Sequence, residues 1–169
     1  MNRSDESAIT LRRAEADDWP SIWPFFRAIV KAGESYPYPS DMPEPEARAV
    51  WMEVPTATCV AERGGRVVGS YYIKPNQLGR GAHVCNCGYM VDPAARGSGV
   101  ATAMCLHSQE EARRLGFLAM QFNLVVSTNE AAVHLWRKLG FKEVGVLPRA
   151  FDHERLGLVD AVVMYRWLG

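Results

Sequence analysis

The sequence lacks the features that mark membrane, secreted and nucleic-acid-binding proteins. No run of about eighteen uncharged apolar residues occurs, as a membrane-spanning helix would need, and the first ten residues hold no apolar stretch of signal-peptide length. Neither sign of charge predominates, because Lys and Arg number 19 and Asp and Glu also number 19. No net field therefore attracts nucleic acid or an anionic membrane. These absences predict a soluble, cytoplasmic protein without a nucleic-acid or membrane partner.

Cysteine is also scarce, and its spacing predicts neither a metal site nor a disulfide framework. Cysteines stand at positions 59, 85, 87 and 105. The close pair, Cys85 and Cys87, forms a C-x-C inside an apolar run, whereas a zinc knuckle has paired C-x-x-C. We expect free, buried thiols in a reducing compartment and no bound metal.

What is present fits an ordinary globular protein. The chain has 169 residues, of which 48% are hydrophobic and 22% charged, so it can bury one core. We therefore expect a single domain over residues 1–169. The predicted elements alternate strand and helix around a central strand–helix–strand–helix unit, which predicts an α/β fold with one mixed sheet and helices on its faces.

The amino-terminal half begins with a strand and a helix. Ile9–Arg13 alternates apolar and polar residues, as a strand does, and Asp17 is expected to cap a helix whose apolar positions continue to Val30. Four prolines exclude regular structure from residues 33–45, which we predict to be a loop. A short helix to about Trp51 follows.

A hairpin and a central strand come next. Gly64-Gly65 separates the strand-like runs Thr58–Glu62 and Val67–Lys74, which is typical of a tight hairpin turn. After a second loop at 75–82, the run His83–Val91 carries no charge. A strand of this kind is covered on both faces, so we place it at the centre of the sheet.

The carboxyl-terminal half predicts two helices and three strands. In chain order they are a helix at 99–115 closed by Gly116, a strand at 117–126, a helix from Asn129 to Gly140, and strands at 141–147 and 159–167 joined by a loop at 148–160.

The turn after the central strand has the chemistry of an anion site. Pro93 ends the strand, and Gly97 and Gly99 remove side chains where the chain enters a helix, so backbone N–H groups are exposed there. Helix amino termini attract phosphate, and Arg96 adds a cation. The alternatives are a tight packing turn and a dinucleotide-binding turn. The dinucleotide-binding turn requires G-x-G-x-x-G and a later acidic residue, and the sequence lacks this pattern.

Two motifs carry a family resemblance. Residues 91–101, VDPAARGSGVA, and residues 129–141, NEAAVHLWRKLGF, resemble the two acetyl-CoA segments of the GCN5-related N-acetyltransferases (GNAT). The resemblance covers the whole chain. It implies a mostly antiparallel sheet whose strands at 83–91 and 117–126 splay apart, with the pantetheine arm of acetyl-CoA pairing to the first of them. It also implies an acetyltransferase and a homodimer.

The same resemblance assigns the residues that contact the coenzyme. They are Met90, Val91, Arg96, Gly97, Ser98, Gly99, Val100, Ala101, Asn129 and Trp136.

Asparagines on the two splayed strands are the candidates for the reacting centre. Asn86 shares a face of its strand with Gly88 and Met90, and Asn123 lies in the middle of the neighbouring strand. A buried amide without partners costs about 1–3 kcal/mol. Each asparagine is therefore expected either to hold the core together or to face a polar ligand, and we favour the ligand.

A closer resemblance concerns the acceptor. The segments around Asn86 and Asn123 are similar to fungal acetyltransferases that act on proline analogues such as azetidine-2-carboxylate. It implies that both asparagines orient a small amino acid and that Asn129, otherwise a helix N-cap, contacts the coenzyme. Tyr36 and Tyr38, between prolines, are expected to roof the acceptor pocket or to form an exposed turn.

The groups that move protons stay open at this stage. Trp136 stands where the family often has a tyrosine acid, and an indole N–H cannot serve as one. Glu34 through water, or His153, could accept the amine proton, although His153 could also be a solvated loop residue. The leading hypothesis is an acetyl-CoA-dependent N-acetyltransferase for a small amine. The alternatives are a peptide acetyltransferase and a non-catalytic acyl-CoA-binding module.

Overall fold

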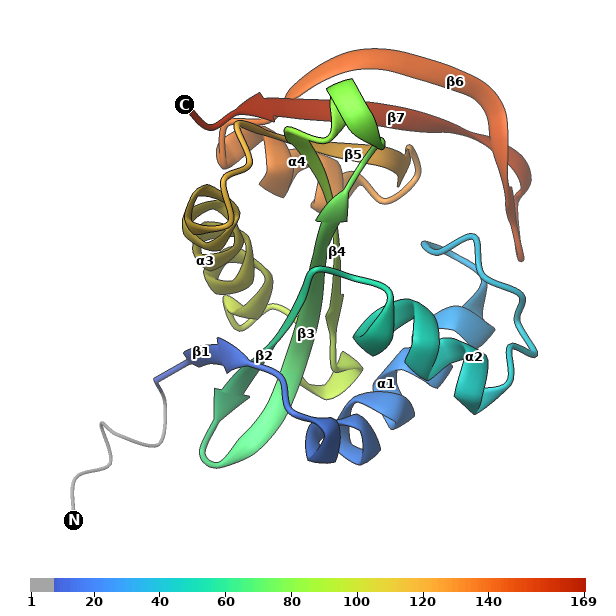
Figure 1. The fold of residues 1–169 in the computed structure, drawn as a ribbon. Helices are drawn as coiled ribbons and strands as arrows, with labels where there is room; N and C mark the ends of the chain where they lie inside the picture. The colour runs from blue at the N-terminus through green and yellow to red at the C-terminus, as the bar shows by residue number, and fades with distance from the viewer. Residues whose placement is uncertain (1–7) are drawn as a thin grey trace.

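A computed structural model of the chain describes residues 8–169 (Figure 1). Two predictions concern residues outside this range. They are the absence of a signal sequence and the first residues of the domain expected over 1–169. The strands are β1 (Thr10–Arg13), β2 (Ala57–Arg63), β3 (Arg66–Pro75), β4 (Val84–Val91), β5 (Ala119–Val126), β6 (Lys142–His153) and β7 (Gly157–Trp167). The α-helices are α1 (Trp19–Ala32), α2 (Glu44–Arg48), α3 (Val100–Arg114) and α4 (Glu130–Lys138).

The strands form one sheet in the order β1-β2-β3-β4-β5-β7-β6. Neighbours pair antiparallel except β4 and β5, which pair parallel. The uncharged run at 83–91 is therefore the central strand, as predicted. The Gly64-Gly65 hairpin is confirmed too, because β2 and β3 pair directly across it.

Helices cover the two faces of the sheet, and the sheet separates the core into two clusters (Figure 1). On one face α3 and α4 pack with residues such as Met104, Met120 and Trp136. On the other face α1 and α2 pack with Phe26 and Trp51. This is the mixed, mostly antiparallel α/β architecture that the sequence predicts.

The predicted loop at 148–160 is wrong. Residues 148–153 extend β6 and residues 157–160 begin β7, so that the two strands form one long hairpin. Pro148 misled the prediction, since proline usually interrupts a ladder. Here the register shifts between Leu147 and Phe151, and Arg149 takes a φ of 52° in the left-handed region, so a bulge accommodates the proline.

The prediction that Asp17 caps α1 is wrong, because Asp18 is the N-cap residue and within residues 8–169 no side chain caps the helix. Asp17 is exposed, and the neighbouring Asp18 is buried. Asp18 accepts a hydrogen bond from the Glu15 backbone N–H at 2.7 Å and two from the Arg12 guanidinium at 2.7 and 2.8 Å. Arg12 also pairs with Glu62 of β2. These contacts attach the first turn of α1 to the edge of the sheet.

Replacing Asp18 by asparagine should lower the free energy of unfolding by about 1–2 kcal/mol near neutral pH. The Arg12 hydrogen bonds hold the pKa of Asp18 below its ordinary value. The contribution of Asp18 is therefore complete above the unfolded pKa of about 4 and is lost as the pH falls through the lower folded value. Urea unfolding near pH 7 and near pH 3 measures the difference. Asp17→Asn is the control, and an equal loss in that variant would contradict the assignment.

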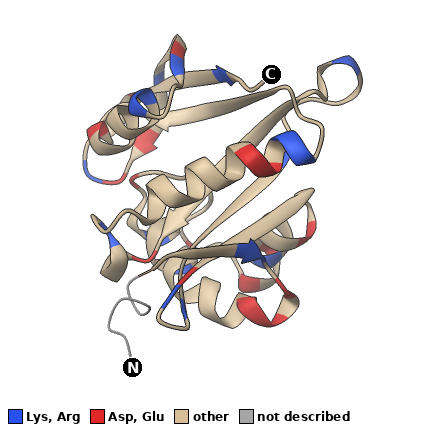
Figure 2. Cartoon of the chain, turned by 90° about the vertical axis from the view of Figure 1, so that its left-hand side faces the viewer, with Lys and Arg blue, Asp and Glu red and all other residues tan. Residues whose placement is uncertain are grey.

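Charged residues of both signs are interspersed along the helices and turns (Figure 2). Among residues 8–169, no helix is long and apolar enough to cross a membrane.

Candidate active site

The central strands separate halfway along their length. β4 and β5 pair only at Val84–Ala119, Cys85–Met120 and Asn86–Gln121. Beyond Asn86 the two strands diverge, as the family resemblance implies. Within the described part of the chain, the edge of β4 from Cys87 to Val91 consequently has no strand beside it on that side, which leaves backbone groups available for a ligand.

Asn86 lies at the point of divergence. It is 7% exposed, and its Nδ2 donates to the Gln121 carbonyl oxygen at 3.0 Å while its Oδ1 accepts from the Tyr72 hydroxyl at 2.9 Å. The side chain thus extends the β4–β5 pairing by one hydrogen bond. Both expectations for Asn86 apply in part, because it joins core elements and also lines the cavity described next.

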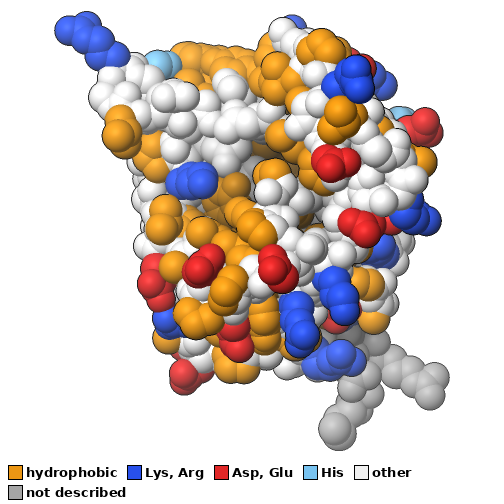
Figure 3. Space-filling view, turned by 90° about the vertical axis from the view of Figure 1, so that its right-hand side faces the viewer, with side chains coloured by type: hydrophobic (Ala, Val, Ile, Leu, Met, Phe, Trp, Pro, Cys, Tyr) orange, Lys and Arg blue, Asp and Glu red, His pale blue; other side chains and the backbone are white. Residues whose placement is uncertain are grey.

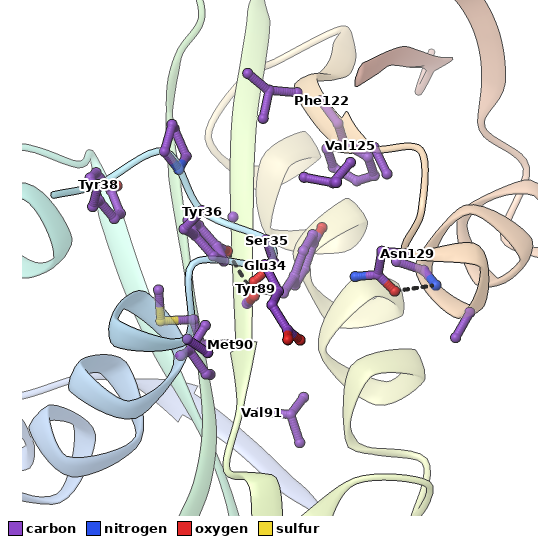
Figure 4. A pocket seen from close by; sticks show the side chains of 18 of the residues that line it. Glu34, Ser35, Tyr36, Tyr38, Tyr89, Met90, Val91, Phe122, Val125 and Asn129 are labelled. Carbon is purple, nitrogen blue, oxygen red and sulfur yellow. Dashed lines mark hydrogen bonds between the residues drawn. The ribbon is translucent and has the colours of Figure 1, made fainter. Parts of the chain in front are cut away.

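A cavity of about 1100 Å³ occupies the space between the diverging strands. Tyr36 and Tyr38 lie on one side of β4, and Phe122, Val125 and Asn129 lie on the other (Figure 4). Of the residues that the sequence assigns to the site, the cavity is lined by Tyr36, Tyr38, Asn86, Met90, Val91, Arg96, Asn123, Asn129 and Trp136.

The remaining assigned residues, Gly97 to Ala101, lie in the turn that follows Arg96 and do not line the cavity itself. Gly97 and Gly99 have φ of 72° and 84°, in the left-handed region, and a Cβ on either would meet nothing within 4 Å. Gly99 is the N-cap of α3, and no side chain among residues 8–169 caps this helix. The amino terminus of α3 therefore has no side-chain cap within the described residues, which fits a pyrophosphate there.

The second coenzyme segment also adjoins the cavity. The Asn129 Oδ1 caps α4 by accepting from the Ala132 N–H at 3.2 Å (Figure 4), so its N-cap role is confirmed while its Nδ2 makes no hydrogen bond within the described residues. Trp136 is 8% exposed and lies 5.0 Å from Tyr89 and 5.2 Å from Phe122 between ring centroids. The indole is thus part of the core and of the cavity wall.

The expectation that Asn123 is buried is wrong. A bulge in β5 between Phe122 and Val125 interrupts its pairing with β7 and leaves Asn123 exposed at the cavity. Its Nδ2 donates to the Asn76 Oδ1 at 2.7 Å, and its Oδ1 accepts from the Gln121 Nε2 at 2.9 Å. These contacts fix the orientation of the Asn123 amide.

The proline-rich loop lines one end of the cavity, which we call the acceptor end because the resemblance implies an acceptor there. Tyr36 and Tyr38 stack with ring centroids 5.7 Å apart, and the Tyr36 hydroxyl donates to the Tyr89 carbonyl oxygen at 2.7 Å. Burial raises the pKa of Tyr36 well above its ordinary value. Tyr36 consequently stays protonated at neutral pH and acts as a hydrogen-bond donor, not as a base.

The tip of the β6–β7 hairpin contacts the loop that begins at Gly33, at the cavity. The Glu154 N–H donates to the Gly33 carbonyl oxygen at 3.0 Å, and Arg155 pairs with Glu34 at 2.6 Å. His153 is 5% exposed, and its Nδ1 accepts from the Arg155 N–H at 3.2 Å. His153 is therefore not the solvated loop residue that we considered. Together with Glu34, it lines the cavity.

Sequence reasoning missed three polar residues at the acceptor end: Tyr72 and Lys74, which line the cavity, and Asn76, which holds Asn123. The signal was present in part, since alternation along β3 places Tyr72 and Lys74 on one face. Their approach to Asn86 depends on the strand order, which a single sequence does not reveal.

Comparisons with known proteins agree with this geometry. The profile described as the Acetyltransferase (GNAT) family matches residues 16–141. N-acetyltransferase aca1 of Schizosaccharomyces pombe is 30% identical over 158 residues, which span 82% of this chain and 75% of that protein.

Solved structures give the same result. A GCN5-related N-acetyltransferase from Kribbella flavida is 47% identical, with a TM-score of 0.90 over 95% of this chain and 98% of that chain. A ribosomal-protein-alanine N-acetyltransferase from Brucella melitensis is 25% identical, with a TM-score of 0.82 over 94% of this chain and 99% of that chain.

Proposed function

The chain belongs to the GNAT family of acetyltransferases, and from this premise we propose that it acetylates the amine of a small molecule, an amino or imino acid. Membership of the family makes it an enzyme whose acyl donor is acetyl-CoA. The proposal extends to the whole of residues 1–169 as one N-acetyltransferase domain.

One observation supports the proposal that the acceptor is a small molecule. The loop at 33–38 and the hairpin tip at 153–156 meet over the cavity through the Glu154–Gly33 hydrogen bond and the Glu34–Arg155 ion pair. A peptide acceptor needs an open groove in which its chain can continue past the reacting amine. Closure at this point supports a compact acceptor.

The reaction forms a bond between the acceptor nitrogen and the acetyl carbon and breaks the carbon–sulfur bond of the thioester. The turn at Gly97–Ala101 and Arg96 would hold the pyrophosphate of the coenzyme, and Asn129 and Trp136 would line its path. Asn86 and Asn123, at the divergence of β4 and β5, would orient the amine and the thioester carbonyl. Positioned amide donors of this kind stabilise charge that develops on the carbonyl oxygen.

Two groups in the cavity can accept the proton that the amine loses. The Glu34 carboxylate, which lies in the ion pair with Arg155, would accept it through water. The His153 Nδ1 is the unprotonated nitrogen of the neutral ring, because it accepts the Arg155 N–H, and it could accept the amine proton only by giving up that hydrogen bond. Trp136 provides no acid, so solvent protonates the departing thiolate in this proposal.

Asn123→Ala should lower kcat by more than tenfold, about 1.4 kcal/mol in the barrier, because the variant loses the amide that orients the reacting groups. Steady-state rates of thiol release measure this change. Asn76→Ala is the matched variant: it removes the acceptor of the Asn123 Nδ2 and should produce a smaller loss. An unchanged rate in a folded Asn123→Ala protein would remove Asn123 from the site.

The function itself is tested by thiol release from acetyl-CoA with a panel of acceptors. The panel contains free amino acids, cyclic imino acids, simple amines and short peptides, and mass spectrometry identifies the N-acetyl product. Turnover with free amino or imino acids is the expected result. Turnover confined to peptides would overturn the small-acceptor proposal.

We also propose a homodimer formed through β6. This edge strand is exposed at every residue except Phe151 and His153, and exposed apolar residues on the hairpin include Val144, Val146 and Leu158. Hydrophobic side chains form a band along the upper edge of this side of the molecule (Figure 3). An open apolar edge pairs readily with a second copy. Sedimentation equilibrium tests this, and a monomer at micromolar concentration would refute it.

A cytoplasmic location is part of the proposal. It is supported by the cysteines, which are all buried and free of disulfides, as expected in a reducing compartment. Fractionation of cells that express the protein tests it, and recovery in an oxidising compartment would contradict it.

A further inference from the structure

Lys74 is a basic residue in the wall of the cavity. The reaction as proposed assigns it no role. It lies near the end of β3, is partly buried, and lines the cavity. Its register partner on β4 is Asn86. Directly opposed residues on neighbouring strands have Cβ atoms about 5 Å apart. The Lys74 side chain therefore starts next to the residue that marks the reacting centre.

The positive charge of Lys74 is not balanced by the protein. Among residues 8–169, no carboxylate forms an ion pair with Lys74. The carboxylate that lines the cavity, Glu34, is paired with Arg155. Arg96 lies at the opposite end, beside the glycine turn that would take the coenzyme phosphates. The acceptor end thus holds a cation without an anion.

The groups around Lys74 are neutral. Its Nζ lies 5.1 Å from the centroid of the Tyr72 ring, and the Tyr72 hydroxyl donates to Asn86. Burial raises the pKa of Tyr72 and of Tyr38, so both rings stay uncharged at neutral pH. The ring face attracts the ammonium weakly, and a charge-assisted hydrogen bond to an anion would bind it more strongly.

We propose that Lys74 binds the carboxylate of the acceptor and thereby selects amino and imino acids over amines that lack a carboxylate. The inference rests on the proposed function and adds the residue that recognises the carboxylate of the substrate. An α-amino group and its carboxylate are attached to one carbon. A carboxylate held by Lys74 consequently keeps the amine beside Asn86, where the strands diverge.

The test compares two acceptors in three proteins. The acceptors are a free amino or imino acid and the amine of the same skeleton without the carboxylate, for example proline and pyrrolidine. The proteins are the wild type, Lys74→Met, which keeps the apolar stem without the charge, and Lys74→Arg, which restores a cation. Lys31→Met on α1, exposed and not among the residues that line the cavity, is the matched control.

We expect Lys74→Met to raise the KM for the amino acid at least tenfold and to change kcat/KM for the simple amine less than twofold. Lys74→Arg should recover most of the loss, and Lys31→Met should behave as the wild type. An equal loss for both acceptors would mean that Lys74 only supports Tyr72, which overturns the inference. So would an unchanged KM for the amino acid.

Failure of this inference differs from failure of the proposed function. Wild-type protein that acetylates both acceptors with equal kcat/KM refutes the carboxylate role and leaves small-amine acetylation standing. Wild-type protein that acetylates neither acceptor but turns over a peptide refutes both. Acetyl-CoA binding, measured by calorimetry in each variant, verifies that the variants are folded.

Discussion

Replacing Gly99 by alanine is expected to raise the KM for acetyl-CoA more than tenfold, with a smaller change in kcat. The residue has a φ of 84°, and its Cβ would project into open space in front of α3. Within the protein the methyl group meets no atom, so the cost to folding is the left-handed conformation alone, about 1–2 kcal/mol. A bound pyrophosphate would lie where the methyl group stands and would lose its approach to the helix N–H groups.

A variant of a second glycine distinguishes the cost of backbone strain from a loss of acetyl-CoA binding. Gly65, in the turn between β2 and β3, has a φ of 73°, and a Cβ there also meets nothing within 4 Å. Gly65→Ala should therefore destabilise the protein by a similar amount and leave the KM for acetyl-CoA unchanged. Thermal unfolding and steady-state kinetics on both variants provide the comparison. Equal KM values in the two variants would mean that the glycine turn does not hold the coenzyme.

Asn86→Ala is expected to lower kcat/KM by about a hundredfold, the typical effect of losing one positioned donor at a reacting carbonyl. The substitution leaves the Gln121 carbonyl and the Tyr72 hydroxyl without their partner. Unpaired buried groups cost about 1–3 kcal/mol of stability. The loss of activity should therefore accompany a lower midpoint of unfolding.

The control for Asn86 is another buried polar residue with two hydrogen bonds. Ser70 accepts from the Trp51 Nε1 and donates to the Cys59 carbonyl oxygen, both at 2.9 Å, and does not line the cavity. Ser70→Ala should lower stability by a comparable amount with nearly unchanged kcat/KM. If both variants lose activity in proportion to stability, the role of Asn86 is structural and not catalytic.

Local patterns predict the elements of this fold well where the signal is local. The Gly64-Gly65 turn, the uncharged central strand and the Asn129 cap each depend on residues a few positions apart, and all are confirmed. The two glycines after Pro93 likewise have the positive φ that the turn requires.

The errors arise where distant segments decide the structure. Pro148 is tolerated in β6 because a bulge removes it from the ladder with β7, and the bulge in β5 brings Asn123 to the surface. No pattern along the chain places Lys74 beside Asn86 or joins Glu34 to Arg155. These contacts depend on strand order and on the position of the hairpin tip, which are properties of the assembled sheet.

The proposal of a small amino or imino acid as acceptor is tested most directly by a ratio of two specificity constants. It compares kcat/KM for the best free amino or imino acid with kcat/KM for a tripeptide that begins with the same residue. The contact of the loop at 33–38 with the hairpin tip over the cavity and the proposed carboxylate contact predict that the free acid is preferred by at least about a hundredfold, or 2.7 kcal/mol. A tripeptide acetylated as fast as the free acid, or faster, would contradict the account.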